Sequence, residues 1–269
     1  MNPSPQKPIV AATGISVRYG DLRVLSGVSV NVFASEIRVI LGMSGCGKTT
    51  LLKTMVGLLR PTRGSVRLFD VTIGEQDDPA TIAVLKKAGV LFQNGALLGS
   101  LTVEENIALP LQMHTALPAA LISEIVAYKL ALVKLSGTGP LHPAELSGGM
   151  RKRAALARAL ALDPPLLFCD EPSAGLDPAT AAGLDRLLLD LRRNLGITLV
   201  VVTHELRSIE TIADNISFLH DGSVLFDGTL AEARNVTSGP VSEFFARAEP
   251  PSPAGAGGSR YGFIVERGS

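Results

Sequence analysis

The segment GMSGCGKT, residues 42–49, decides the fold of this 269-residue chain. It fits the spacing G-x-x-x-x-G-K-[ST], in which glycines let successive backbone N–H groups converge on phosphate oxygens at the start of a helix. Lys48 would then reach the outer phosphates of a nucleotide, and the Thr49 hydroxyl would bind Mg²⁺. An ordinary Gly-rich turn is the alternative, but the strand-like Ile37–Leu41 before the segment favours a nucleotide site. The expected nucleotide contacts in this loop are Gly42, Met43, Ser44, Gly45, Cys46, Gly47, Lys48, Thr49 and Thr50.

A pair of carboxylates follows another apolar run. Residues 166–171 read LLFCDE, which predicts a buried strand that ends in Asp170 and Glu171. Hydrolysis assisted by Mg²⁺ needs one carboxylate to hold the metal's water shell and another to orient the attacking water. We expect Asp170 in the first role and Glu171 in the second. Alone, the pattern is often only a strand that enters an acidic turn; together with the phosphate loop it indicates hydrolysis.

A second helix terminus suited to anions occurs in LSGGM, residues 146–150. Ser147, Gly148 and Gly149 would open a helix that continues from Met150, and the N-terminus of a helix presents free N–H groups. An isolated match of this kind is more often a Gly-capped loop. The phosphate loop already serves one nucleotide, so a second anion site in the same chain requires an explanation.

The rest of the chain alternates strand-like and helix-like segments. Strands are predicted at 15–19, 24–32, 37–41, 166–169, 197–202, 216–219 and 223–226, and helices at 48–57, 119–135, 150–161 and 179–195. This alternation is typical of an α/β fold with a mainly parallel core sheet. Residues 13–40 predict an antiparallel β subdomain, and residues from about 94 to 163 predict an inserted helical subdomain.

Composition restricts the possible functions. Lys plus Arg number 25 and Asp plus Glu number 25, so the chain lacks the positive field of a nucleic-acid binder. Two cysteines exclude a disulfide framework and favour a reducing cytoplasm. No apolar run approaches the length of a membrane span, and the N-terminus does not resemble a signal peptide. We therefore expect that, at a membrane, another chain would hold this one.

The glycine loop, the LSGG signature and LLFCDEP, in this order, resemble the ATP-binding cassette (ABC) family over residues 9–235. The resemblance implies a P-loop NTPase (ABC ATPase) that uses ATP and Mg²⁺ as a head-to-tail dimer, in which the signature of one subunit caps the γ-phosphate held by the other. It implies that Gln93 touches Mg²⁺ and the attacking water, and that Asp177 couples the two sites. It also implies that His204 contacts the γ-phosphate and that Tyr19 stacks on adenine.

A narrower resemblance rests on three stretches. LFQNGALLGSLTVEENIALPL, MHTALP and LSGGMRKRAALARALALDP are similar to the ATPases of maintenance-of-lipid-asymmetry (Mla) phospholipid transporters and related Mce systems. This implies multi-spanning permease subunits, an Mce-domain protein and a small STAS-domain regulatory subunit as partners, at the cytoplasmic face of a bacterial inner membrane. The alternatives are the ATPase of a solute importer or of a lipoprotein-releasing exporter, and a soluble cassette protein.

The helical subdomain and the Gln93 loop are expected to form a groove for a cytoplasmic permease helix. His114 and Leu117 would lie near it, although a solvated loop histidine is an equal alternative for His114.

The ATPase domain is expected at residues 9–248, followed by a flexible linker and C-terminal tail at 249–269. The linker EPPSPAGAGGS is too rich in Pro and Gly to pack. Four apolar residues follow it, and their exposure to water is unfavourable. The resemblance implies a tail that grips the partner subunit, and a frayed tail is the alternative. The four residues are Tyr261, Phe263, Ile264 and Val265.

The thiol of Cys46 lies inside the phosphate loop, near the start of a helix. Helix N-termini lower thiol pKa values, so Cys46 is expected to react with alkylating agents and to be protected by ATP. A shielded, unreactive thiol is the alternative. Cys169, on the strand that leads to Asp170, is expected to be inert core.

Overall fold

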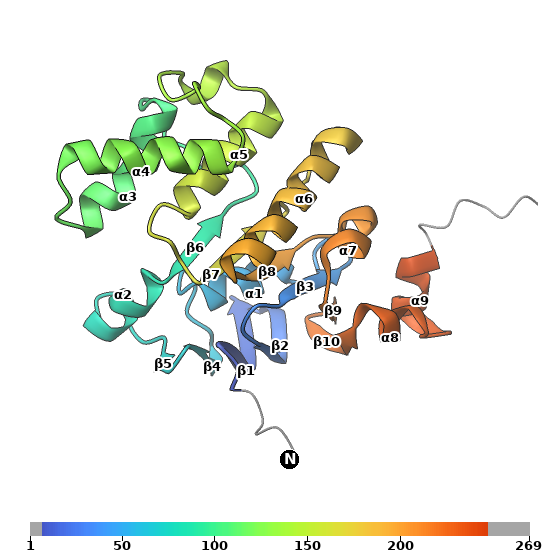
Figure 1. Ribbon diagram of the computed structural model, residues 1–269. Coiled ribbons are helices and arrows are strands. Elements are labelled where there is room, and N and C mark those ends of the chain that lie inside the picture. Colours follow the sequence, from blue (N-terminus) through green and yellow to red (C-terminus); the bar gives the residue numbers. More distant parts are fainter. Residues whose placement is uncertain (1–6, 247–269) are drawn as a thin grey trace, which may run out of the picture.

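A six-stranded sheet forms the centre of the molecule in the computed structural model, which describes residues 7–246. The strand order is β10-β9-β3-β8-β7-β6 (Figure 1). All neighbours pair in parallel except β10, which runs antiparallel to β9. The predicted mainly parallel core sheet is therefore confirmed. The strands are β3 (Ile37–Gly42), β6 (Ala88–Leu91), β7 (Leu166–Asp170), β8 (Thr198–Val202), β9 (Asn215–His220) and β10 (Ser223–Thr229).

Both faces of this sheet are covered, because its central strands are apolar on both sides. In β3, Val39 packs into one hydrophobic cluster and the adjacent Ile40 into another on the opposite face. In β8, Val201 packs into the first of these clusters and Val202 into the second, on the opposite face. Near-continuous apolar runs are what a parallel sheet buried on both faces requires.

A smaller antiparallel sheet packs across one of these faces, in the order β2-β1-β4-β5. Its strands are β1 (Val10–Tyr19), β2 (Leu22–Val32), β4 (Arg63–Leu68) and β5 (Val71–Thr72). The antiparallel β subdomain was predicted only as far as β1 and β2. The strand β4 was missed because only two of its six side chains, Val66 and Leu68, are buried apolar groups, so its apolar pattern is short.

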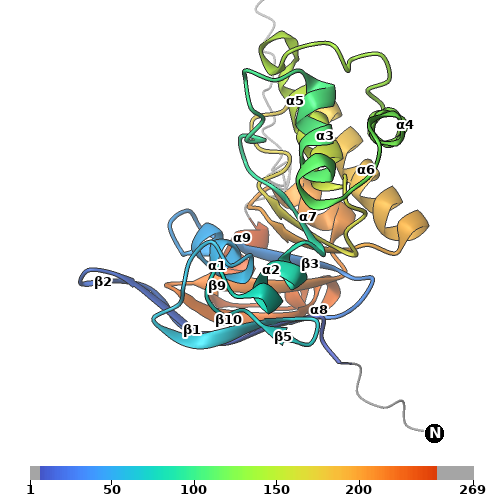
Figure 2. The same cartoon turned by 90° about the vertical axis from the view of Figure 1, so that its left-hand side faces the viewer.

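A separate group of helices gathers beyond β6 on one side of the molecule, and Figures 1 and 2 show it apart from the β-rich portion. It contains α3 (Val103–His114), α4 (Ala119–Leu132), the short 3-10 helix η1 (Pro143–Glu145) and α5 (Gly148–Ala159). The first of these begins with a reciprocal capping box between Thr102 and Glu105. All four lie inside the stretch predicted as a helical insertion.

The other helices cover the faces and one end of the core sheet. They are α1 (Lys48–Met55), α2 (Pro79–Leu85), α6 (Pro178–Leu195), α7 (Leu206–Ile212), α8 (Leu230–Arg234) and α9 (Gly239–Ala246). Among residues 7–246, none of the helices combines the length and the apolar character needed to cross a membrane. The predicted linker and tail at 249–269 lie outside the residues that the structure describes.

Candidate nucleotide site

Four neighbouring parallel strands deliver the predicted functional residues to one edge of the core sheet. The phosphate loop follows β3, His204 follows β8, Asp170 ends β7 with Glu171 directly after it, and Gln93 follows β6. The carboxyl ends of adjacent parallel strands meet at the same edge, which is where ligands bind in open α/β sheets. The sheet order thus brings together segments that are more than 100 residues apart in sequence.

The phosphate loop has the backbone that its glycines permit. Gly47 caps α1 with a φ of 103°, and a Cβ atom at this position would lie 2.6 Å from Leu25 Cδ2. The Lys48 ammonium is buried and donates to the carbonyl oxygens of Gly42 at 2.8 Å and Met43 at 3.0 Å. A phosphate at the start of α1 would meet both the loop N–H groups and this ammonium.

The side chains of Thr49 and Asp170 meet across the loop. The Thr49 hydroxyl donates to Asp170 Oδ1 at 3.2 Å. Burial raises the pKa of Asp170, and the Thr49 hydrogen bond opposes that rise. Hydroxyl and carboxylate oxygens are the ligands that Mg²⁺ prefers, usually completed by water and phosphate oxygens. No group of three His, Cys, Asp or Glu side chains that could hold a metal occurs within 7–246. The Thr49 hydroxyl and the Asp170 carboxylate fit Mg²⁺ as oxygen ligands beside a bound nucleotide.

The side chain of Glu171 is held at one oxygen and free at the other. His204 Nδ1 lies 2.7 Å from Glu171 Oε1, and because an ionised carboxylate only accepts, Nδ1 carries the hydrogen. Oε2 is buried and makes no hydrogen bond with the described part of the chain. The backbone of Glu171 has a φ of 46°, in the left-handed region that residues other than glycine seldom adopt. A free basic oxygen on a fixed carboxylate is what the orientation of an attacking water requires.

Lys152 is a site residue that the sequence analysis missed. Its ammonium is buried at the centre of α5 and donates to the backbone carbonyls of Gln93 and Glu171, the latter at 3.0 Å. Burial lowers the pKa of Lys152, while the charges of Glu171 and Asp170 oppose that change. Position 152 lies on the buried face of the helix with Ala155 and Leu156, but a lysine in a helix is usually solvated, so the sequence alone does not single it out.

The loop that carries Gln93 is held mainly by the helical group. Arg158, on α5, donates to the carbonyl oxygens of Gly95 at 2.9 Å and Ala96 at 2.7 Å. On α3, the buried Asn106 side chain exchanges two hydrogen bonds with the backbone of Leu98. The Gln93 side chain itself is exposed. Any movement of the helical group relative to the sheet would therefore move Gln93.

The LSGG signature lies at the start of α5, as the sequence predicted. Ser147 caps the helix by accepting from the Met150 N–H at 3.3 Å, and both Ser147 and Gly148 are exposed. Gly149 is buried against α6, where a Cβ atom would lie 2.4 Å from the Thr180 side chain. Figures 1 and 2 both show the start of α5 apart from α1 and the phosphate loop. The exposed signature is thus available to another molecule.

Two residues implied by the family resemblance have defined positions. Asp177 caps α6, and its carboxylate accepts from the N–H groups of Ala179 at 3.1 Å and Thr180 at 3.0 Å. A hydrogen bond from the Thr180 side chain, followed by those from these N–H groups, lowers the pKa of Asp177. Tyr19 lies at the end of β1 with 52% of its surface exposed. The roles of Asp177 in coupling and of Tyr19 in adenine stacking stay predictions.

The expectation that Cys46 has a lowered pKa is wrong. The thiol is buried among the apolar residues of β2 and α1, and burial raises its pKa, only partly offset by the charge of Lys48. The prediction included the effect of the helix N-terminus but not the free-energy cost of removing a thiolate from water. Cys169 is fully buried, and burial raises its pKa to about 12.

Alkylation of Cys46 is consequently expected to be slow at neutral pH. The thiolate is the reactive form, so a raised pKa leaves less of it at pH 7, and the rate of inhibition should increase about tenfold per pH unit below that pKa. We expect iodoacetamide to leave ATPase activity nearly intact at pH 7 and to inhibit faster as the pH is raised. The Cys46→Ser variant should lose this inhibition. Rapid inhibition at pH 7 that ATP prevents and Cys46→Ser abolishes would restore the original expectation.

Comparison with known proteins agrees with this geometry. The family model described as ABC transporter matches residues 25–174, which is more than half of the chain. The chain belongs to the ABC transporter family and is one of its ATPase cassettes.

Among curated relatives, one is the intermembrane phospholipid transport system ATP-binding protein MlaF of Escherichia coli. It is 39% identical over 221 residues, covering 82% of each chain. A probable ribonucleotide transport ATP-binding protein of Mycobacterium tuberculosis is 42% identical over 215 residues, covering 80% of this chain and 60% of the relative. The match thus spans less than two thirds of the mycobacterial protein. The methionine import ATP-binding protein MetN 2 of Paraburkholderia xenovorans is 40% identical over 76% of this chain and 53% of its own length.

Solved structures share the same fold. A dimeric ATP-binding cassette in a post-hydrolysis state with ADP and phosphate is 31% identical, with a TM-score of 0.76 over 82% of this chain and 98% of that chain. A cassette from Clostridium perfringens, described as part of an ABC transporter complex, is 26% identical with the same TM-score, over 90% of this chain and 92% of that chain.

Proposed function

We propose that this chain is the ATP-hydrolysing subunit of a transporter that moves phospholipid between the membranes of a bacterial envelope, from the cytoplasmic face of the inner membrane. The single observation that carries the lipid assignment is the 39% identity to the phospholipid transport protein of Escherichia coli, which covers 82% of both chains. The ATP site rests on the strand-end geometry described above.

Hydrolysis follows from the chain's own groups. The phosphate-loop N–H groups and Lys48 would hold the phosphates, while Thr49, Asp170 and Gln93 would supply oxygen ligands for Mg²⁺. When bound, Mg²⁺ neutralises charge on the phosphates. Glu171 Oε2 accepts a proton from water, and His204 keeps the carboxylate oriented through Oε1.

The head-to-tail dimer is supported by the exposed signature. The start of α5, which Ser147 caps, lies apart from α1 and the phosphate loop of its own chain (Figure 1). A second copy of the chain would bring its own phosphate loop to this terminus, which suits anions. In this arrangement each ATP is bound by two chains, and Asp177 lies in the loop between Glu171 and α6 where the two copies would meet.

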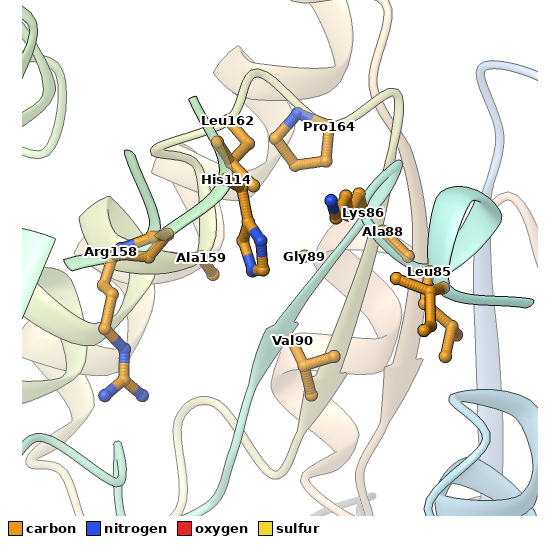
Figure 3. Close-up of a pocket in the computed structure, with 12 residues that line it drawn as sticks. Leu85, Lys86, Ala88, Gly89, Val90, His114, Arg158, Ala159, Leu162 and Pro164 are labelled. Carbon is orange, nitrogen blue, oxygen red and sulfur yellow. The ribbon is translucent and has the colours of Figure 1, made fainter. Parts of the chain in front are cut away.

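A groove between the helical group and the core sheet is the proposed docking site for a permease helix. It has a volume of about 360 Å³ and is lined by Ile82, Leu85, Lys86, Ala88, Gly89, Val90, Pro110, His114, Arg158, Ala159, Leu162 and Pro164. Figure 3 shows the His114 ring pointing into the space between Arg158 and the strand that carries Val90. His114 is the last residue of α3 and not a loop histidine, whereas Leu117 packs against the core and not in the groove. Because Arg158 also holds the loop after Gln93, a helix in the groove would act on that loop.

Ile82→Asp is expected to weaken permease binding about tenfold or more, because it places a charge at the apolar rim of this groove, where Ile82 is 41% exposed. The measurement is the amount of multi-spanning subunit that co-purifies with the tagged full-length chain. Leu225→Asp is the matched control, since Leu225 is 52% exposed on β10 and does not line the groove. Equal recovery with both variants would place the docking site elsewhere.

The same purification tests the lipid assignment. If the transporter is of the Mla or Mce type, an Mce-domain protein, and in some systems a small STAS-domain subunit, will co-purify with the permease, together with phospholipid detectable by mass spectrometry. A periplasmic solute-binding protein in place of the Mce-domain protein would favour a solute importer. That second candidate is supported by the 40% identity to the methionine import protein.

A further inference from the structure

Three buried polar side chains form a hydrogen-bonded relay behind the hydrolysis site. Ser173, Ser208 and Asp185 are each only 3% exposed. The Ser173 and Ser208 hydroxyl oxygens lie 3.1 Å apart, and the Ser208 hydroxyl donates to Asp185 Oδ2 at 2.8 Å. None of the three is a residue that the phosphate loop, the signature or the metal ligands account for, so the relay needs its own explanation.

The direction of donation in this relay follows from counting hydrogens. Ser208 has one hydroxyl hydrogen, and it is directed to the Asp185 carboxylate. The Ser173 hydroxyl must therefore be the donor in the contact with Ser208. With Asp185 ionised, this arrangement makes both bonds, and the relay connects the three segments through buried hydrogen bonds.

The segments that the relay joins are the two loops of the hydrolysis site. Ser173 follows Glu171 by two residues, and Ser208 lies in the first turn of α7, four residues after His204. Asp185 lies on the buried face of α6, the long helix packed against α7. The two loops are thus connected at the site by the 2.7 Å contact between Glu171 and His204, and again in the interior by the relay, which anchors both to α6.

Folding stability does not explain why position 185 carries a carboxylate. Its second oxygen, Oδ1, is buried and has no hydrogen-bond partner among residues 7–246. Burial also raises the pKa of Asp185, since the charged form is the one that burial disfavours. An apolar side chain would avoid both costs. Buried groups that oppose stability in this way are concentrated at functional sites.

We propose that Asp185, acting through Ser208 and Ser173, is a positioning residue that sets the spacing between Glu171 and His204. The proposal rests on the hydrolytic roles proposed above for those two residues. With the relay intact, His204 retains Glu171 Oε1, and Oε2 stays free for the attacking water. Because the relay does not include a nucleotide contact, it acts on kcat and not on the affinity for ATP.

Ser208→Ala is the first test, because it removes the middle hydroxyl with little change in volume. In the full-length chain purified with its membrane subunits, we expect kcat for ATP to fall about tenfold and KM to change less than about twofold. Ser217→Ala is the matched control: Ser217 is also buried and donates to a carboxylate, Asp227, at 2.6 Å, but it lies on β9 away from the two loops. Its kcat should stay within about twofold of wild type. A Ser208→Ala enzyme that behaves like this control would overturn the proposal.

Two substitutions of Asp185 separate hydrogen bonding from bulk. Asp185→Asn keeps an oxygen that accepts from Ser208 and should retain kcat within about threefold, whereas Asp185→Ala removes the acceptor and should lose activity as Ser208→Ala does. Rescue by the amide is the signature of a positioning hydrogen bond. Equal losses in the two variants would overturn the role of the acceptor oxygen.

The link to His204 is tested by combining substitutions. If Ser208 acts by placing His204 against Glu171, then adding Ser208→Ala to His204→Ala should lower kcat no further than His204→Ala alone. Losses that multiply in the double variant would overturn the relay. If His204→Ala alone keeps the wild-type kcat, the proposed hydrolysis site fails and the relay with it. If His204→Ala lowers kcat and Ser208→Ala does not, the hydrolysis site stands and only the relay falls.

Discussion

Glu171→Gln will bind ATP yet turn it over about 10²–10⁴-fold more slowly than the wild-type chain, the range that a general base contributes. The amide keeps the shape of the carboxylate and its hydrogen-bond length to His204, but it has no basic oxygen to accept a proton from water. The unpartnered Oε2 atom is the one whose basicity is lost. The variant should therefore accumulate as an ATP-bound dimer, which is measured by light scattering with and without ATP.

Glu205→Gln is the matched control for this experiment. Glu205 is the residue after His204, is half-exposed, and lies 4.0 Å from the other ring nitrogen of His204. It carries a charge near the site without a direct hydrogen bond to the ring, so its turnover should stay within a few-fold of wild type. If Glu171→Gln kept turnover within a few-fold as well, the assignment of Glu171 would be wrong.

The sequence predicts well those parts of the molecule whose apolar pattern is continuous. The apolar runs that form β7 and β8 are buried at every position. The phosphate loop was predicted from its glycines, and the positive φ of Gly47 is a conformation that glycine permits. Strands β4 and β6 were not predicted, because their runs are short and contain few buried apolar side chains: Val66 and Leu68 in β4, and Leu91 in β6. Their pairing with β1 and β7 stabilises them, and that pairing is not visible in a local pattern.

The site was predicted as a set of residues but not as a set of contacts. The sequence placed Glu171 and His204 in separate roles, whereas the structure joins them in one hydrogen bond. Lys152 and Asp185 belong to helices in which a charged residue reads as a solvated position until the buried face is known. For Cys46 a local effect, the helix terminus, was outweighed by burial, which depends on the packing of β2 against the loop. In each case, contacts between residues far apart in the sequence determine the hydrogen bonding, the burial or the pKa of the side chain.

Lys48→Ala is expected to weaken ATP binding about 10- to 100-fold, because the loop loses the charge-assisted hydrogen bonds of its buried ammonium. Ser147→Arg should abolish turnover differently, by placing a bulky side chain at the exposed N-terminus of α5, where the partner's ATP is expected. Either homodimer then has two defective composite sites. A dimer that contains one chain of each variant distinguishes the two arrangements more sharply than either homodimer.

A dimer with Lys48→Ala on one chain and Ser147→Arg on the other concentrates both defects in one composite site if the signature acts in trans. The second site combines an intact phosphate loop with an intact signature, so turnover should recover to about half of the wild-type value. The control places both substitutions on one chain and pairs it with a wild-type chain: each site then has one defect, and turnover should stay near zero. Two different affinity tags isolate the mixed dimers for the ATPase assay. A head-to-tail arrangement therefore requires turnover in the first mixed dimer and almost none in the control dimer. If each chain completed its own site, the pattern would reverse, because the wild-type chain of the control dimer would hold one intact site and the first dimer would hold none.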